Sequence, residues 1–167
     1  PLYDATLNTF QEYKTSDITN NLSVEWNITP DLTFRGRLGL TKLNSDSDYF
    51  RPADHTAFAS TENILRRGSY RYGVNKGFRY DASANLSYTR QIGNHAVFAG
   101  LEYNIRESKA SGYSFLAEGF ANPNFDFISM ALQYAENGKP GGSESLARSV
   151  GVTGSVNYTY DERYFMD

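Results

Sequence analysis

The chain has 167 residues, a formal net charge of −3 and no cysteine. This length suits one domain, the charge argues against nucleic acid as a partner, and the lack of cysteine excludes disulfide bonds and thiolate metal sites. Aromatic residues make up 15% of the chain, a content that favours strands over helices. No apolar run approaches the roughly 20 residues of a membrane-spanning helix, and residues 1–10 do not read as a signal peptide. We therefore predict an all-β protein.

The first regular pattern is a two-residue period, which predicts an antiparallel hairpin over residues 18–43. Residues up to Lys14 carry no such period and are predicted to be the end of a loop. The turn of the hairpin is Thr29-Pro30-Asp31. The apolar positions on either side of it are Leu22, Val24, Trp26, Ile28, Leu32, Phe34, Leu38 and Leu40. The hairpin thus has one apolar and one polar face.

Two further hairpins are predicted over residues 79–107 and 147–167, with turns at Gly93-Asn94 and Asp161-Glu162-Arg163. Long polar stretches separate the three hairpins and are predicted to be loops that carry short helices. In the first, residues 61–67 suit a helix that ends at Gly68. In the second, residues 125–136 suit a helix with Asn124 as its N-cap. The prediction is a meander of five to six strands with two long loops.

Tight and long connections alternate along the chain, so all tight turns fall at one end of the predicted sheet and all long loops at the other. Outer-membrane β-barrels have this asymmetry, and a tilted strand of about 11 residues spans their lipid-facing band of about 25 Å. The apolar face would meet lipid, with aromatic residues near the turns as an interfacial girdle. The polar face would line a watery lumen. The charged residues predicted to face that lumen are Glu25, Arg35, Arg37, Glu102 and Arg106.

Several segments, in their order and spacing, resemble the SusC/RagA-like TonB-dependent outer-membrane transporters. The matching pieces are Pro1-Leu2-Tyr3-Asp4-Ala5, Asn20-Asn21-Leu22, Leu32-Thr33-Phe34-Arg35-Gly36-Arg37-Leu38-Gly39, Tyr80-Asp81-Ala82 and Val156-Asn157-Tyr158-Thr159-Tyr160 followed by Asp161-Glu162-Arg163-Tyr164-Phe165. The resemblance covers essentially the whole chain and implies a mid-barrel portion, residues 1–167, of a much larger protein.

This resemblance implies a barrel of about 22 strands in the outer membrane of a Gram-negative bacterium. Such a barrel is plugged by an N-terminal domain, energised through TonB and covered by a lipoprotein lid of the SusD type. It imports oligosaccharides or peptides and is not an enzyme. The expected partners of the full-length protein are therefore the lid lipoprotein, TonB, membrane lipid and the nutrient. The chain itself has neither the plug nor the TonB-contacting segment, and its last hairpin is cut off, so we expect a fragment.

The aromatic residues of the two long loops are the candidate contacts for substrate or partner, because rigid rings give contact area at little entropic cost. The alternative is that they pack each loop against its neighbours. The candidates are Tyr49, Phe50, Tyr70, Tyr72, Tyr113, Phe115, Phe120 and Phe125. No catalytic residue, cofactor or metal is predicted, since His55 and His95 lie far apart and Asp46-Ser47-Asp48 lacks the later ligands of a calcium loop.

Two other classes of function are alternatives to the transporter. A soluble carbohydrate-binding β-sandwich would turn one face of each strand into a dry core. A hydrolase of the outer-membrane barrel type would need a nucleophile with its base, which these residues do not supply. A barrel fragment outside the membrane would instead bury its apolar face by packing against itself or a second copy, so self-association is expected.

Overall fold

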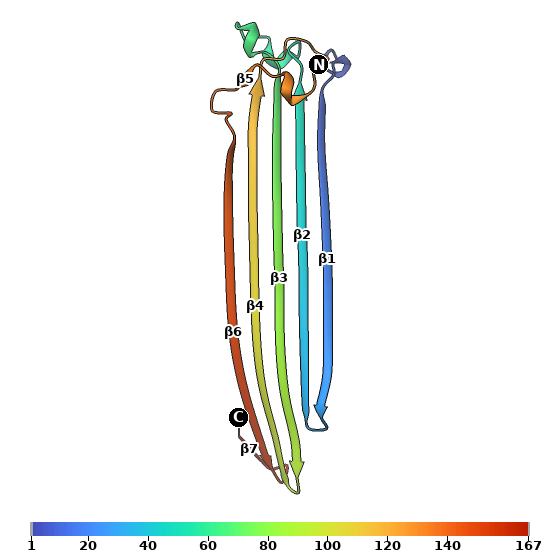
Figure 1. Ribbon diagram of the computed structural model, residues 1–167, viewed down its shortest axis with the longest axis vertical. Helices are drawn as coiled ribbons and strands as arrows, with labels where there is room; N and C mark the ends of the chain where they lie inside the picture. The colour runs from blue at the N-terminus through green and yellow to red at the C-terminus, as the bar shows by residue number, and fades with distance from the viewer. Residues whose placement is uncertain (1, 167) are drawn as a thin grey trace. The chain divides into compact units, whose positions relative to one another are not determined.

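The chain is all-β, and its strands form one antiparallel meander in the order β1-β2-β3-β4-β6-β7, with β5 paired to β4 (Figure 1). A computed structural model describes residues 2–166. Asp167, the last residue of the third predicted hairpin, lies outside this range. The long strands are β1 (Phe10–Thr29), β2 (Leu32–Arg51), β3 (Ser69–Ile92), β4 (His95–Glu118) and β6 (Gly141–Tyr160), and the short ones are β5 (Gln133–Tyr134) and β7 (Tyr164–Met166). The predicted fold class and all three turns are confirmed.

The long strands have 20 or 24 residues, about twice the predicted length. Residues 44–51, 69–78 and 108–118 were predicted as loop but belong to β2, β3 and β4, and β1 already begins at Phe10. Residues 44–51 and the start of 108–118 carry polar side chains on both faces, so no hydrophobic period marks them. Residues 69–78 do alternate, with Tyr70, Tyr72, Val74 and Phe78 on one face, so the loop prediction was wrong there although the period is present. The strand conformation of the polar sections depends on pairing with neighbouring strands, which a single stretch of sequence does not reveal.

Neither predicted helix forms as an α-helix; residues 2–166 contain four single 3-10 turns. They are η1 (Asp4–Thr6), η2 (Thr56–Phe58), η3 (Ile64–Arg66) and η4 (Ile128–Met130). The helix predicted over residues 61–67 is reduced to η3, followed by Gly68 at φ +79°. The helix predicted over residues 125–136 is wrong, because the Leu132 amide donates instead to the carbonyl groups of Glu118 and Gly119, at 3.2 and 3.1 Å. Pairing with β4 takes up the hydrogen bonds that a helix would need.

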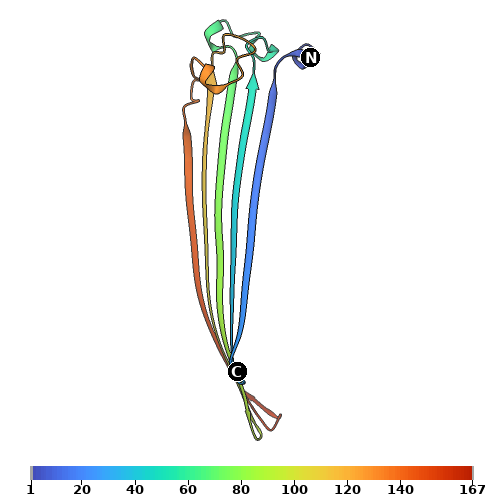
Figure 2. The same cartoon turned by 45° about the vertical axis from the view of Figure 1, so that its right-hand side comes forward.

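The chain divides into two compact units, and every long strand contributes to both. Unit 1 consists of the described part of Pro1–Asp17 together with Leu43–Gly77 and Ala110–Ser145. Unit 2 consists of Ile18–Lys42, Phe78–Lys109 and the described part of Leu146–Asp167. All three tight turns belong to unit 2 and both long connections belong to unit 1, where they lie side by side (Figure 2). The two kinds of connection are thus segregated, as their alternation predicts.

Buried hydrophobic side chains occur in unit 1 alone among the described residues. Phe50, Tyr70 and Phe120 form a cluster there, with Phe10 and Tyr72 packed against it. The rings of Phe50 and Phe120 meet edge to face at a centroid distance of 5.1 Å. In residues 2–166 a single sheet is present and no second layer covers unit 2. The β-sandwich alternative, which requires a dry core between two sheets, does not fit.

Candidate functional site

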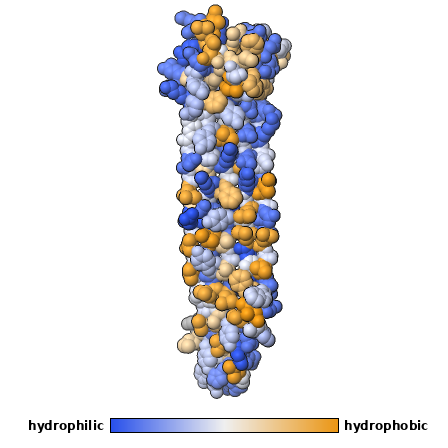
Figure 3. Space-filling view, viewed as in Figure 1, coloured by the Kyte–Doolittle hydropathy of each residue, from blue (hydrophilic) through white to orange (hydrophobic). Residues whose placement is uncertain are grey.

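One face of the unit 2 strands is apolar and uncovered. Leu22 is 61% exposed, Trp26 62% and Val156 63%, values that are high for large hydrophobic side chains. Figure 3 shows hydrophobic side chains gathered at the surface over strands of the sheet. Contiguous exposed apolar surface of this kind marks a face that meets another apolar phase or a partner. The predicted packing of this face against the chain itself does not occur in residues 2–166.

The apolar sections of the strands are shorter than the strands themselves. In β1 the inward-outward alternation places Ile18, Leu22, Val24, Trp26 and Ile28 on the apolar face, interrupted by Asn20, whereas Glu12 and Lys14 occupy the corresponding positions nearer its start. In β4 the apolar positions run from Val97 to Ile105 and are followed at the same spacing by Glu107. Counted from Ile18 to Ile28 and from Val97 to Ile105, these two sections match the roughly 9–11 residues that a tilted strand needs to cross a membrane.

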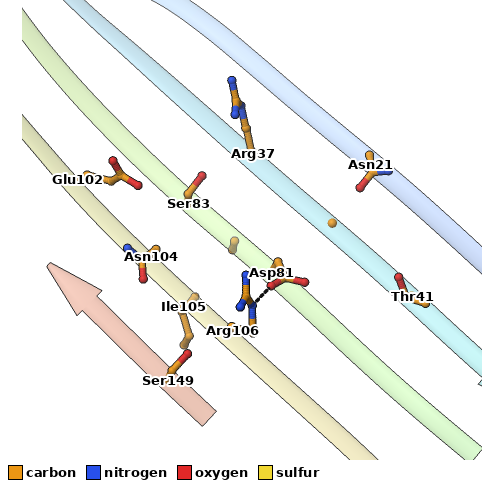
Figure 4. Close-up of a pocket in the computed structure, with 12 residues that line it drawn as sticks. Asn21, Arg37, Thr41, Asp81, Ser83, Glu102, Asn104, Ile105, Arg106 and Ser149 are labelled. Atoms are coloured by element: carbon orange, nitrogen blue, oxygen red, sulfur yellow. Dashed lines mark hydrogen bonds and ion pairs between the residues drawn. The ribbon is translucent and has the colours of Figure 1, made fainter. Parts of the chain in front are cut away.

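The opposite face of unit 2 is polar and contains a cavity of about 560 Å³ (Figure 4). All five long strands contribute to its lining. The labelled side chains are those of Asn21, Arg37, Thr41, Asp81, Ser83, Glu102, Asn104, Ile105, Arg106 and Ser149. Small residues at this face, among them Gly39, keep the surface open: a Cβ there would lie 3.0 Å from the amide oxygen of Asn21.

The five charged residues predicted to face a lumen all lie in unit 2, on the same side of the sheet. Arg37, Glu102 and Arg106 line the cavity, and Arg35 lines a neighbouring depression with Arg37 and Glu102. Glu25 accepts a hydrogen bond from Arg35 at 2.9 Å. The strand alternation thus brings these charges together on one side of the sheet.

The cavity also contains polar residues that were not predicted as site residues. Asp81 forms an ion pair with Arg106, and Asn21 and Asn104 add amide groups. All three occupy the polar positions of the alternation, so the two-residue period could have identified them. Their amide and carboxylate groups, with the arginines, give the face both donors and acceptors for a polar solute.

The aromatic residues predicted as loop contacts lie mostly in strands. Tyr49 and Phe50 belong to β2, Tyr70 and Tyr72 to β3, and Tyr113 and Phe115 to β4, which leaves Phe120 and Phe125 in the connection between β4 and β6. The loop assignment was wrong for six of the eight. Around Tyr49 and Phe50 no apolar period marks the strand, whereas Tyr70 and Tyr72 belong to a two-residue period that continues to Val74 and Phe78.

Burial separates these aromatic residues into two groups. Phe50 is 0% exposed and Phe120 is 1% exposed, so a contact role for these two side chains does not fit and packing is their function. Tyr70 is also buried, and its hydroxyl donates to Asp48 at 2.6 Å. Burial, and then this hydrogen bond to a carboxylate, raises the pKa of Tyr70 above its usual value.

Several other aromatic side chains remain at the surface. Tyr113 and Phe125 are half-exposed, and the Tyr113 hydroxyl donates to Glu144 at 3.0 Å, which raises the pKa of Tyr113. Tyr72 and Phe115 are only partly exposed and pack against each other with tilted rings, at a centroid distance of 5.5 Å. Tyr113 and Phe125 therefore stay available for the predicted contacts.

The two histidines and Asp48 each have a hydrogen-bond partner. Nδ1 of His55 accepts the Ala57 amide at 3.0 Å, and Nδ1 of His95 lies 2.6 Å from the Tyr158 hydroxyl. Asp48 is engaged by the Tyr70 hydroxyl. Within residues 2–166 there is no group of three or more His, Asp or Glu side chains placed to hold a metal ion.

No family model and no curated protein matches the sequence. Among solved structures, the chain is similar to the RagAB peptide transporter, with a TM-score of 0.71 and 14% identity over 91% of this chain. It is similar to the same extent to the RagAB peptide importer in its closed-closed state and, at 13% identity, in its open-open state. The chain spans 17% of the transporter chain, and 16% of the chain in the open-open state. At this identity the likeness is one of fold.

No helix of the described residues is long and apolar enough to cross a membrane.

Proposed function

We propose that the chain forms part of the wall of an outer-membrane transporter, with the apolar face of unit 2 against lipid and the polar face toward the transport path. One observation carries the proposal: apolar strand sections of membrane-spanning length stand uncovered on one face, while the opposite face gathers charges around a cavity. Charges on a dry face would be costly, and large apolar side chains left in water would lose the stabilisation that burial gives them.

The likeness in fold to the RagAB peptide transporter supports a transport role and favours peptides over oligosaccharides as the imported nutrient. The resemblance to SusC/RagA-like proteins adds TonB as the energy source and a SusD-type lipoprotein as lid, both acting with parts outside this chain. The localisation proposed is the outer membrane of a Gram-negative bacterium. The chain has a binding and structural role, not an enzymatic one.

Trp26 offers a direct test because it is the only tryptophan of the chain and lies on the apolar face. The chain is folded into phosphatidylcholine vesicles whose acyl chains are brominated, and its fluorescence is compared with that in unbrominated vesicles. We expect Trp26 emission to shift to the blue and to be strongly quenched by bromine. Unchanged emission in both vesicle types would overturn the lipid-facing assignment.

A matched variant moves the probe to the other face. In Trp26→Phe/Asn27→Trp the new ring lies one residue further along β1 and so points to the polar side of the sheet. We expect little quenching from this position. Equal quenching of the two proteins would show that bromine does not distinguish the faces, and would contradict the proposal.

The same face explains the expected behaviour without lipid. Its large hydrophobic side chains stand in water in the single chain, so we propose that copies associate through it when no membrane or detergent is present. Light scattering in buffer and in detergent compares the two conditions. A monodisperse monomer in buffer would argue against association.

A further inference from the structure

A second cavity, of about 320 Å³, lies in unit 1 and is strongly basic. Arg51 of β2, Arg66 of η3 and Arg71 of β3 line it, together with Tyr49 and a single carboxylate, that of Glu118 in β4. The three contributing strands are neighbours in the sheet (Figure 1). Three permanent positive charges thus face one negative charge.

The one carboxylate is already engaged. Nε of Arg66 donates to Oε1 of Glu118 at 3.0 Å, and the side-chain amide of Gln133 donates to the same oxygen at 2.8 Å. Only 10% of the Glu118 side chain is exposed. Arg66 also approaches Glu136 at 3.5 Å. Glu118 therefore holds Arg66 and the connection after β4 in place, and it does not neutralise the remaining arginines.

Arg51 and Arg71 have no carboxylate partner within residues 2–166. Nε of Arg51 donates to the Tyr49 hydroxyl, and the guanidinium carbon lies 4.5 Å from the centroid of the same ring. Tyr49 thus holds Arg51 in place, and the two terminal nitrogens of Arg51 remain as donors for a ligand in the cavity. Arg71 is exposed and belongs to the same cavity lining. Each of these guanidinium groups is a planar set of donors, of the kind that pairs with planar oxyanions.

We infer that this cavity binds a carboxylate group, and that the ligand carrying it is an acidic oligopeptide. A guanidinium can bind a carboxylate through two parallel hydrogen bonds, a geometry that the flat group of an Asp or Glu side chain satisfies. The cavity volume suits one such residue with its backbone, and Tyr49 and Phe58 give it apolar walls. This site deepens the proposed transport role, on which the choice of a peptide rests, and carboxylate binding by it does not require the chain to cross a membrane.

The test is calorimetric titration of the detergent-held chain with tri-glutamate, with tri-glutamine as the neutral probe and tri-galacturonate as the carboxylate-bearing sugar. We expect tri-glutamate to bind, tri-glutamine not to bind, and the binding to weaken with salt. Binding of tri-galacturonate in place of tri-glutamate would overturn the peptide assignment. Equal binding of the neutral and acidic peptides would overturn the site itself.

Arg71→Gln is the diagnostic variant because Arg71 is exposed and its loss leaves the packing intact. Loss of a charge-assisted hydrogen-bonded pair should weaken tri-glutamate binding by about tenfold or more. The matched control is Lys76→Gln, which removes an exposed positive charge of the same strand outside the cavity. An equal loss in both variants would reduce the effect to net charge and contradict the site.

Glu118→Gln tests the same cavity in the opposite direction. Removing the only carboxylate of the lining should strengthen tri-glutamate binding by several-fold, while the amide oxygen can still accept from Arg66. Weaker binding in a variant whose circular dichroism is unchanged would contradict the inference. The titration is made in detergent and tests only the cavity of unit 1, so a lack of tri-glutamate binding would not affect the lipid-facing assignment of unit 2. Likewise, a lack of Trp26 quenching in vesicles would not affect the binding site.

Discussion

The aromatic cluster of unit 1 predicts that one side chain, Phe120, anchors the connection between β4 and β6. Phe120 is 1% exposed and its ring contacts those of Phe50 and Tyr70, at centroid distances of 5.1 and 6.4 Å. Its amide also donates to the Arg67 carbonyl at 3.0 Å, which joins the connection to the preceding one. Phe120→Ala removes the ring and leaves the backbone contact.

Truncating a fully buried Phe to Ala costs about 3–5 kcal/mol, because transfer energy is lost and a cavity remains. At about 1.4 kcal/mol for each factor of ten, local opening of the connection should become at least about 100-fold more frequent. The strand sections that belong to unit 2 contain none of the cluster residues, so local opening of these sections should change little.

Hydrogen exchange followed residue by residue measures this effect. The amide of Leu132, which is bonded to the carbonyl groups of Glu118 and Gly119, should exchange much faster in Phe120→Ala. Phe125→Ala is the matched control, since that ring belongs to the same connection but is 43% exposed. If Leu132 exchanged at the same rate in both variants, the cluster would not be what holds the connection.

Three further predictions concern single positions. In urea unfolding, Gly93→Ala should cost roughly 1 kcal/mol and Gly119→Ala should cost more. Both glycines have positive φ, but of the two only Gly119 would place a Cβ 2.4 Å from a backbone oxygen. Equal losses of stability in the two variants would contradict the clash. The raised pKa of Tyr70 means that the unfolded chain ionises first, so the contribution of Tyr70 to stability should be constant below about pH 10 and be lost above it, and Tyr70→Phe should flatten this fall in unfolding measured against pH. Glu25→Gln should cost less than about 1 kcal/mol, since the ion pair with Arg35 is half-exposed on both sides, and a larger loss would indicate a buried interaction.

The part of the candidate site that lies on the polar face of unit 2 could be predicted from the sequence, because the alternation of polar and apolar residues determines which side chains share that face. The period of two assigns Arg37, Glu102 and Arg106 to one face, and their convergence on one cavity follows from the pairing of neighbouring strands. No comparable sequence pattern predicts the basic cavity of unit 1. Arg66 reaches it from a connection and Glu118 from a strand section that was predicted as loop, so nothing in the sequence relates the two.

The sequence by itself determined the all-β class, the three tight turns and the two faces of the unit 2 strands. These features are local, because turn residues and the alternation of Leu22, Val24 and Trp26 state them within a few residues. Only the tertiary structure decided how far the strands extend into polar sequence and which rings are buried. Phe10, Phe50, Tyr70 and Phe120 are far apart along the chain, and their contact depends on long-range strand pairing that no local pattern records.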